Sequence, residues 1–210
     1  MERRVLVPVP LDRLTLRRIA GCLGAGLVLG VMTNLAQGWL PGAWNNIVNS
    51  GAVWSAVAFV AGVVLADRRV RVAMAGGLAS EVGLVAGYYG FAEFGRGGMG
   101  HLPVVLLWLS MALVAGPLFG AAGSWWRRGS LKRRVVGCAA LAGVFGAEAV
   151  HYAFVLQYMP QAWVCAVLMM GLPLGMTRDN RERALMLSVA VLLALCAYAV
   201  VFQGMEMIVF

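Results

Sequence analysis

The sequence predicts an all-α integral membrane protein with seven transmembrane helices. Of its 210 residues, 61% are hydrophobic and only 12% are charged, whereas a soluble domain is roughly 45–50% apolar and about 25% charged. A helix needs roughly 20 mostly apolar residues to cross about 30 Å of hydrocarbon. Seven segments meet this requirement, approximately 19–37, 47–66, 72–94, 102–124, 135–157, 161–177 and 184–204.

The basic residues predict how these helices are oriented. Sixteen of the 17 Lys and Arg residues precede the first span or lie in the segments 67–71, 127–134 and 178–183, and only Arg96 lies on the other side. By the positive-inside rule, the N-terminus is cytoplasmic and Phe210 is on the outer side. We therefore attribute the net charge of +8 to topology and to contacts with anionic membrane lipids, not to nucleic-acid binding. The excess of Arg over Lys is typical of a bacterial protein from a G+C-rich genome, so we expect the bacterial inner membrane.

Two alternating patterns divide the first six spans into three helical-hairpin repeats. In each outward helix a basic residue precedes a glycine by twelve positions, at Arg18 to Gly30, Arg71 to Gly83 and Arg134 to Gly146. In each returning helix a tryptophan precedes a glycine by eight positions, at Trp54 to Gly62, Trp108 to Gly116 and Trp163 to Gly171.

Each unit holds two helices, so all three repeats would enter the membrane with the same orientation, as parallel repeats. Their approximate limits are 17–69, 71–128 and 133–178, and the last helix, 184–204, stands alone. The domain organisation is a basic cytoplasmic segment, 1–18, followed by a single transmembrane domain, 19–210. The alternative is that each Trp is an interface anchor and each Gly a packing contact, which explains the residue types but not the constant spacing.

Two carboxylates lie deep inside predicted spans. Glu81 follows Arg71 by ten residues, which places it ~15 Å from the inner side, near the midplane. Glu148 follows Arg134 by 14 residues, ~21 Å deep and in the outer half. Because such groups are costly in lipid, both are expected to face the bundle interior or a wet cavity.

Alignment of the second and third repeats brings these carboxylates to corresponding helix faces. The alignment places Tyr88 opposite His151 and Val85 opposite Glu148, and Glu81 precedes Val85 by four residues, on the same face. The predicted ligand-binding set is therefore Glu81, Tyr88, Glu148, His151 and Tyr152. Polar residues before the second span could line the mouth of the same cavity, namely Asn45, Asn46 and Asn49. Loop residues near the outer surface are expected to be solvated, namely Glu93, Arg96, His101 and Glu206.

Glu148, His151 and Tyr152 occupy positions i, i+3 and i+4, one surface of a helix. A carboxylate beside a histidine can serve as a proton relay, an acid and base pair, or a cation site. The structural alternative is that Glu148 is protonated and hydrogen-bonded to a neighbouring helix, while His151 and Tyr152 lie at the outer interface. Both interpretations fit the sequence.

No cofactor or metal is predicted. Glu-x-x-His is the spacing of carboxylate-bridged di-metal bundles, but such sites need a second Glu-x-x-His, and Glu81 is followed by Leu84 at that position. The four cysteines lie singly within spans and support neither a disulfide framework nor a zinc site. The sequence also has no Walker loop, Gly-x-Ser-x-Gly or His-Glu-x-x-His motif.

Two short segments carry a resemblance to a family. The stretch from Asn49 to Phe59, Asn-Ser-Gly-Ala-Val-Trp-Ser-Ala-Val-Ala-Phe, and the stretch from Val85 to Tyr89, Val-Ala-Gly-Tyr-Tyr, resemble an uncharacterised family of small polytopic bacterial membrane proteins. The resemblance extends over most of the chain. It implies no known activity, so it assigns no functional residue.

Three functions fit these observations. The first is binding or transport of a small cationic or protonatable solute through an outward-facing cavity lined by Glu81 and Glu148. The second is a cofactor-independent intramembrane cyclase or isomerase acting on an apolar or isoprenoid substrate, with Glu148, His151 and Glu81 as catalytic candidates. The third is a structural or assembly partner of another membrane protein, and the last helix could close a homo-oligomer interface.

Overall fold

The computed structural model describes residues 12–202, and this part of the chain is helical and contains no strand. Seven helices among the described residues are long and apolar enough to cross a membrane. The predicted all-α, seven-span, multi-pass membrane fold is therefore confirmed. Most of the basic segment 1–18, Glu206 and the predicted end of the last span lie outside the described residues.

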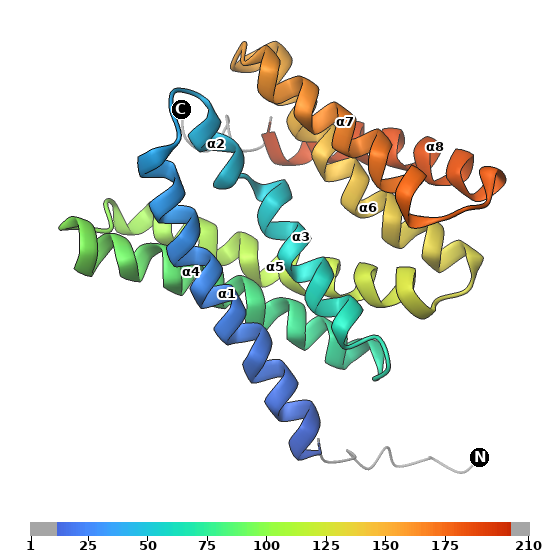
Figure 1. The fold of residues 1–210 in the computed structure, drawn as a ribbon, viewed down its shortest axis with the longest axis horizontal. Helices are drawn as coiled ribbons and strands as arrows, with labels where there is room; N and C mark the ends of the chain where they lie inside the picture. Colours follow the sequence, from blue (N-terminus) through green and yellow to red (C-terminus); the bar gives the residue numbers. More distant parts are fainter. Residues whose placement is uncertain (1–11, 203–210) are drawn as a thin grey trace.

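Eight α-helices and two π-helical turns follow one another along the chain. They are α1 (Arg13–Trp39), α2 (Trp44–Val48), α3 (Gly51–Val64), α4 (Val70–Arg96), α5 (Leu102–Arg128), α6 (Leu131–Val150), η1 (His151–Val155), α7 (Met159–Met176), α8 (Asn180–Ala197) and η2 (Tyr198–Phe202). Figure 1 shows the connections α3–α4, α5–α6 and α7–α8 at the lower right and the other three at the upper left. All three basic connections thus lie at one end of the bundle, which we call the basic end.

The helices begin where a side chain satisfies free backbone N–H groups. Asp12 accepts from Thr15 N at 2.7 Å and starts α1 six residues before the predicted span. Asp179 accepts from Arg181 N at 2.8 Å and starts α8. At the other terminus of α4, Gly97 adopts a left-handed backbone with φ of 79°, which ends the helix.

The second span is broken, although the sequence predicted one continuous helix over 47–66. Asn49 and Ser50 leave helical geometry between α2 and α3. The Ser50 hydroxyl accepts from Val53 N at 3.2 Å, so it caps a new helix start instead of continuing the first. Backbone that leaves helical geometry at membrane depth needs polar partners or a cavity beside it.

Glycines allow α1 and α4 to cross with their backbones in contact. A β-carbon at Gly26 or Gly30 of α1 would overlap a carbonyl oxygen of α4, and one at Gly83 or Gly87 of α4 would overlap a carbonyl oxygen of α1. Both pairs have the small-xxx-small spacing that favours close approach of membrane helices. α3 and α5 cross in the same way, with Gly62 facing Gly120.

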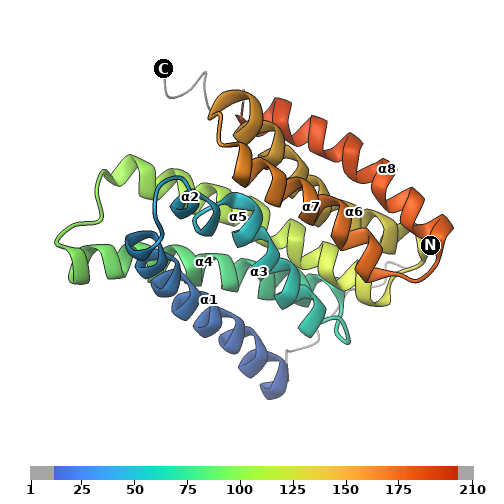
Figure 2. The same cartoon turned by 45° about the horizontal axis from the view of Figure 1, so that its top comes forward.

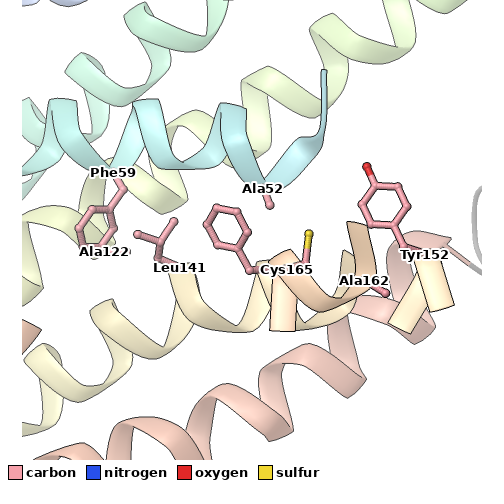
Figure 3. Packing of buried hydrophobic residues seen from close by; sticks show 8 residues of the cluster. Ala52, Phe59, Ala122, Leu141, Tyr152, Ala162 and Cys165 are labelled. Carbon is pink, nitrogen blue, oxygen red and sulfur yellow. The ribbon is translucent and has the colours of Figure 1, made fainter. Parts of the chain in front are cut away.

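The bundle has two parts, which Figures 1 and 2 show from two directions. One contains α1, α3, α4 and α5, and the other contains α6, α7 and α8. They meet where α3 and α5 pack on α6, around a buried apolar cluster. Figure 3 shows Phe59 and Ala52 of α3 facing Leu141 of α6 and Tyr152 of η1. This junction positions the site described below.

The three predicted repeats differ in their packing. α4 packs on α5 and α6 on α7, but α1 packs chiefly against α4 and not against α3, its predicted hairpin partner. Trp54 is 3% exposed whereas Trp163 is 71% exposed. A β-carbon at Gly171 would meet nothing within 4 Å, in contrast to Gly62. The threefold repeat stays a prediction from sequence, and the packing it would require is not shared by the three units.

Candidate functional site

At the basic end, charged groups are paired. Arg134 Nη2 lies 3.0 Å from Glu182 Oε2, and the Thr177 hydroxyl donates to the same oxygen at 2.7 Å. The Glu182 side chain is 6% exposed, so this is a mostly buried carboxylate with a cationic and a hydroxyl partner. Arg18 and Asp67 form a second pair at 2.8 Å, which joins α1 to the α3–α4 connection.

A cavity of about 410 Å³ lies towards the opposite end of the bundle, between α3, α4, α5 and α6. It is partly open and begins beside the break between α2 and α3. Glu81 from α4 and Glu148 from α6 both line it. Neither Lys nor Arg is among the described residues that line it. The two carboxylates singled out by the sequence therefore share one cavity without a strongly basic partner there.

Glu148 holds the first turn of α3. Its side chain is 95% buried by relative exposure, and its Oε1 atom accepts from Ala52 N at 2.8 Å, between residues 96 positions apart in sequence. A carboxylate at a helix N-terminus satisfies a free N–H group and interacts favourably with the helix dipole. The structural alternative, a hydrogen bond from Glu148 to a neighbouring helix, is thus part of the structure. Its Oε2 atom is buried and has no hydrogen-bond partner among the described residues.

Glu81 has less support than Glu148. It is 3% exposed, and its Oε1 atom is buried without a hydrogen-bond partner among residues 12–202. The neighbouring hydroxyl of Ser80 donates to Gly77 O at 2.8 Å and so does not serve the carboxylate. Buried carboxyl groups without partners are costly, and they are characteristic of functional sites in membrane proteins.

His151 and Tyr152 also line the cavity, as their spacing from Glu148 predicts. They begin the π-helical turn η1, in which Leu156 N donates to His151 O at 3.1 Å. Single π-turns within α-helices are frequent at functional sites. The i, i+3, i+4 surface of α6 is therefore directed into the cavity, and these two residues are not confined to the outer interface.

Tyr88 is the one member of the predicted set that does not line the cavity. Its hydroxyl donates to Gln37 Oε1 of α1, and its ring lies edge-on to Trp54 with 6.0 Å between ring centroids. The crossing of α1 over α4 places Tyr88 between these helices. Of the three asparagines predicted at the mouth, Asn46 and Asn49 line the cavity.

The sequence analysis did not identify the aromatic wall of the site. Trp54 and Trp108 line the cavity with 5.1 Å between ring centroids and a tilt of 44°. Both had been recognised only as markers of the repeat. Their spacing to Gly62 and Gly116 was the available signal, because these glycines bring α3, α4 and α5 together at the level of the rings.

The geometry can bind a cation or exchange protons, since two carboxyl groups, a histidine and a phenol surround the same space. Within the described part of the chain, no three His, Cys, Asp or Glu side chains are grouped closely enough to hold a metal ion.

Comparison with known proteins adds the family. A family model described as a family of unknown function, DUF6518, matches residues 10–207. The chain belongs to this family. The resemblance inferred from two short segments, to an uncharacterised family, agrees with this membership, and DUF6518 brings no assigned activity. No curated protein matches the chain, and no solved structure matches it.

Proposed function

We propose that this DUF6518 protein binds or transports a small cationic or protonatable solute in the cavity between α3, α4, α5 and α6. The observation that carries the proposal is the convergence of Glu81 and Glu148 from different helices on one cavity without Lys or Arg among its described lining residues. A pocket of this charge favours cations, and its volume falls in the range of about 300–1,000 Å³ that small-molecule sites occupy.

The proposed setting is the bacterial inner membrane, with the N-terminus in the cytoplasm and the C-terminus outside. The three basic connections and the start of α1 lie at one end of the bundle, as expected for the cytoplasmic end. The cavity begins beside the α2–α3 break and η1, towards the other end, so it would be reached from the outer side. Three parallel repeats with α8 as an added helix remain our proposal for how the fold arose.

Glu81 and Glu148 have different roles in this proposal. Glu81 supplies the carboxylate that meets the solute charge, because neither of its oxygens is used in a recorded hydrogen bond. Glu148 joins the solute to α3, because one oxygen accepts from Ala52 N while the other is available. Solute charge at Glu148 would then act on the start of α3 as well.

The test is thermal unfolding of the detergent-purified protein with alkali cations, amines, vitamins and isoprenoid lipids. Wild type is compared with the Glu81→Gln/Glu148→Gln variant and with Glu93→Gln, a control glutamate that is exposed on the same helix as Glu81. A ligand at 100 times its Kd stabilises by about 2.7 kcal/mol, so a cationic ligand should raise the midpoint of wild type and Glu93→Gln only. If every ligand shifts the double variant as much as wild type, the proposal is wrong.

The second candidate is an intramembrane acid and base enzyme acting on an apolar substrate. It is favoured by the position of His151 beside Glu148 in a cavity whose other walls are largely apolar, since proton-driven isomerisation needs such groups away from water. Incubation with lipid extract would distinguish the two. A new product formed by wild type and not by Glu148→Gln would favour the enzyme, whereas copurification of another membrane protein would favour an assembly role.

A further inference from the structure

We infer that the ligand of this cavity is a protonated organic amine, with its ammonium N–H groups directed to Glu81 and Glu148 and an apolar body packed against Trp54 and Trp108. The inference rests on the proposed function and specifies its ligand class. It predicts discrimination against inorganic cations, neutral analogues and fully methylated amines.

The polar part of the argument is an excess of unused acceptors. Glu81 Oε1 and Glu148 Oε2 are buried without hydrogen-bond partners among the described residues, and Asn49 Oδ1 is in the same position. All three residues line the cavity. An ammonium group carries only donors, so it can satisfy several such acceptors at once. Hydrogen bonds that also carry charge are about twice as strong as neutral ones.

The charge of the site fits a single positive group. Glu148 is already partly compensated by Ala52 N at 2.8 Å and by the positive end of the α3 dipole. Glu81 has no comparable partner: its helix neighbours are apolar or small, and the Ser80 hydroxyl is used by Gly77 O. One ammonium charge would therefore compensate the carboxylate that the fold leaves uncompensated.

The walls of the cavity favour an organic body over a bare metal ion. Apolar and aromatic side chains form most of the wall, including Trp54, Trp108, Met111 and Phe119. A hard cation such as Mg²⁺ or Ca²⁺ requires at least six oxygen ligands in close contact, and carbon walls provide none. The two indoles, 5.1 Å apart, offer faces for both dispersion contacts and cation–π attraction.

Unused carboxylate and amide acceptors also distinguish among amines. A trimethylammonium group retains the charge and the cation–π contact but has no N–H to donate. It would leave Glu81 Oε1 and Glu148 Oε2 without hydrogen bonds, and unsatisfied buried acceptors carry a large penalty. A primary amine should therefore bind more tightly than its quaternary counterpart with the same body.

The same chemistry is available from a free amine or from the head group of an aminophospholipid, and the experiment separates these sources. Binding of 2-phenylethylamine is measured by titration calorimetry at neutral pH with the full chain in lipid-free detergent. The titration is repeated in nanodiscs of phosphatidylcholine and in nanodiscs containing phosphatidylethanolamine. Competition only in the second kind of nanodisc would identify the lipid head group as a source.

Three probes of similar size isolate each feature: 2-phenylethylamine, its N,N,N-trimethyl derivative and 2-phenylethanol. We expect the primary amine to bind more tightly than the other two, by about 10- to 100-fold for the alcohol, from the usual strength of hydrogen bonds to charged groups. Glu81→Gln should weaken amine binding by a similar factor and leave binding of the alcohol unchanged. Glu93→Gln should bind all three like wild type. Circular dichroism and gel filtration establish that each variant is folded.

The inference is overturned if the alcohol or the quaternary amine binds as tightly as the primary amine, or if Glu81→Gln retains full amine affinity. If the amines fail but an inorganic cation stabilises wild type and not the Glu81→Gln/Glu148→Gln variant, the proposed function stands and the inferred ligand class is wrong. If no cation of either kind distinguishes these two proteins, both are wrong.

Discussion

The two ends of the bundle bury glutamates in different ways. At the basic end, Glu182 has a guanidinium partner in Arg134 at 3.0 Å and a hydroxyl partner in Thr177 at 2.7 Å. Towards the other end, Glu81 is buried to the same degree, at 3% exposure against 5%, but has no basic partner in the cavity it lines. Burial is therefore similar and pairing is not. The paired carboxylate holds helices together, whereas the unpaired one is available to something that enters from outside.

The largest effect is expected when the paired carboxylate loses its partner. Arg134→Ala should lower the free energy of unfolding by about 2 kcal/mol, less than the roughly 3–5 kcal/mol of fully buried pairs, because the Arg134 side chain is 40% exposed. Denaturation in mixed detergent micelles measures the change. Arg133→Ala is the control, since Arg133 is exposed and next in sequence. Equal stability of the two variants would mean that Glu182 is not held by this pair.

The matched substitution at the cavity should act with the opposite sign. Glu81→Met keeps a similar length but removes a buried carboxyl group that has no basic partner, so stability should be unchanged or rise by about 1 kcal/mol. The same denaturation experiment applies. A loss as large as that of Arg134→Ala would show that Glu81 is a structural residue and would remove the contrast between the two ends.

Glu148 should combine both behaviours. Glu148→Ala removes the acceptor of Ala52 N, the first-turn N–H of α3, and should destabilise the protein by about 1 kcal/mol, as is typical for loss of a helix cap. Glu148→Gln retains a carbonyl acceptor at the same position and should lose less. The comparison of unfolding midpoints for the two variants measures the cap. Identical midpoints would assign the contact no structural weight.

The smallest effect concerns the exposed pair at the basic end. The hydrogen bond from Arg18, helped by its charge and that of Arg68, holds the pKa of Asp67 below its ordinary value of 3.8. A depressed pKa stabilises the fold above the ordinary value, and this contribution is lost as the pH falls through the folded pKa. The melting difference between wild type and Asp67→Asn should thus be small at neutral pH and vanish below about pH 3.8. A difference that grows in acid would contradict this assignment.

The sequence was sufficient for those features that depend on hydropathy and local spacing. Apolar length located the spans, and the i, i+3, i+4 spacing placed Glu148, His151 and Tyr152 on the surface that faces the cavity. Depth along the helices likewise selected Glu81 as an interior carboxylate. Each of these inferences requires only the geometry of one helix.

Features that depend on contacts between distant segments were missed. The break in the second span has a local signal in Ser50, but the carboxylate that meets Ala52 N comes from 96 residues away. Tyr88 was placed with the cavity because helix periodicity does not reveal that α1 crosses that part of α4. Trp54 and Trp108 were misinterpreted for the same reason, since their proximity depends on how glycines bring three helices together.

The π-helical turn η1 has a consequence for insertions and deletions in this chain. A π-turn accommodates one more residue than the α-turn it replaces, and its hydrogen bond from Leu156 N to His151 O spans five residues. Deletion of Ala153 would convert the turn to α-helix and rotate the following segment by about 100° relative to α6. His151 would stay in place while Leu156, which also lines the cavity, would turn away. The number of residues in this turn, and not only their identity, therefore sets the shape of the cavity beside α6.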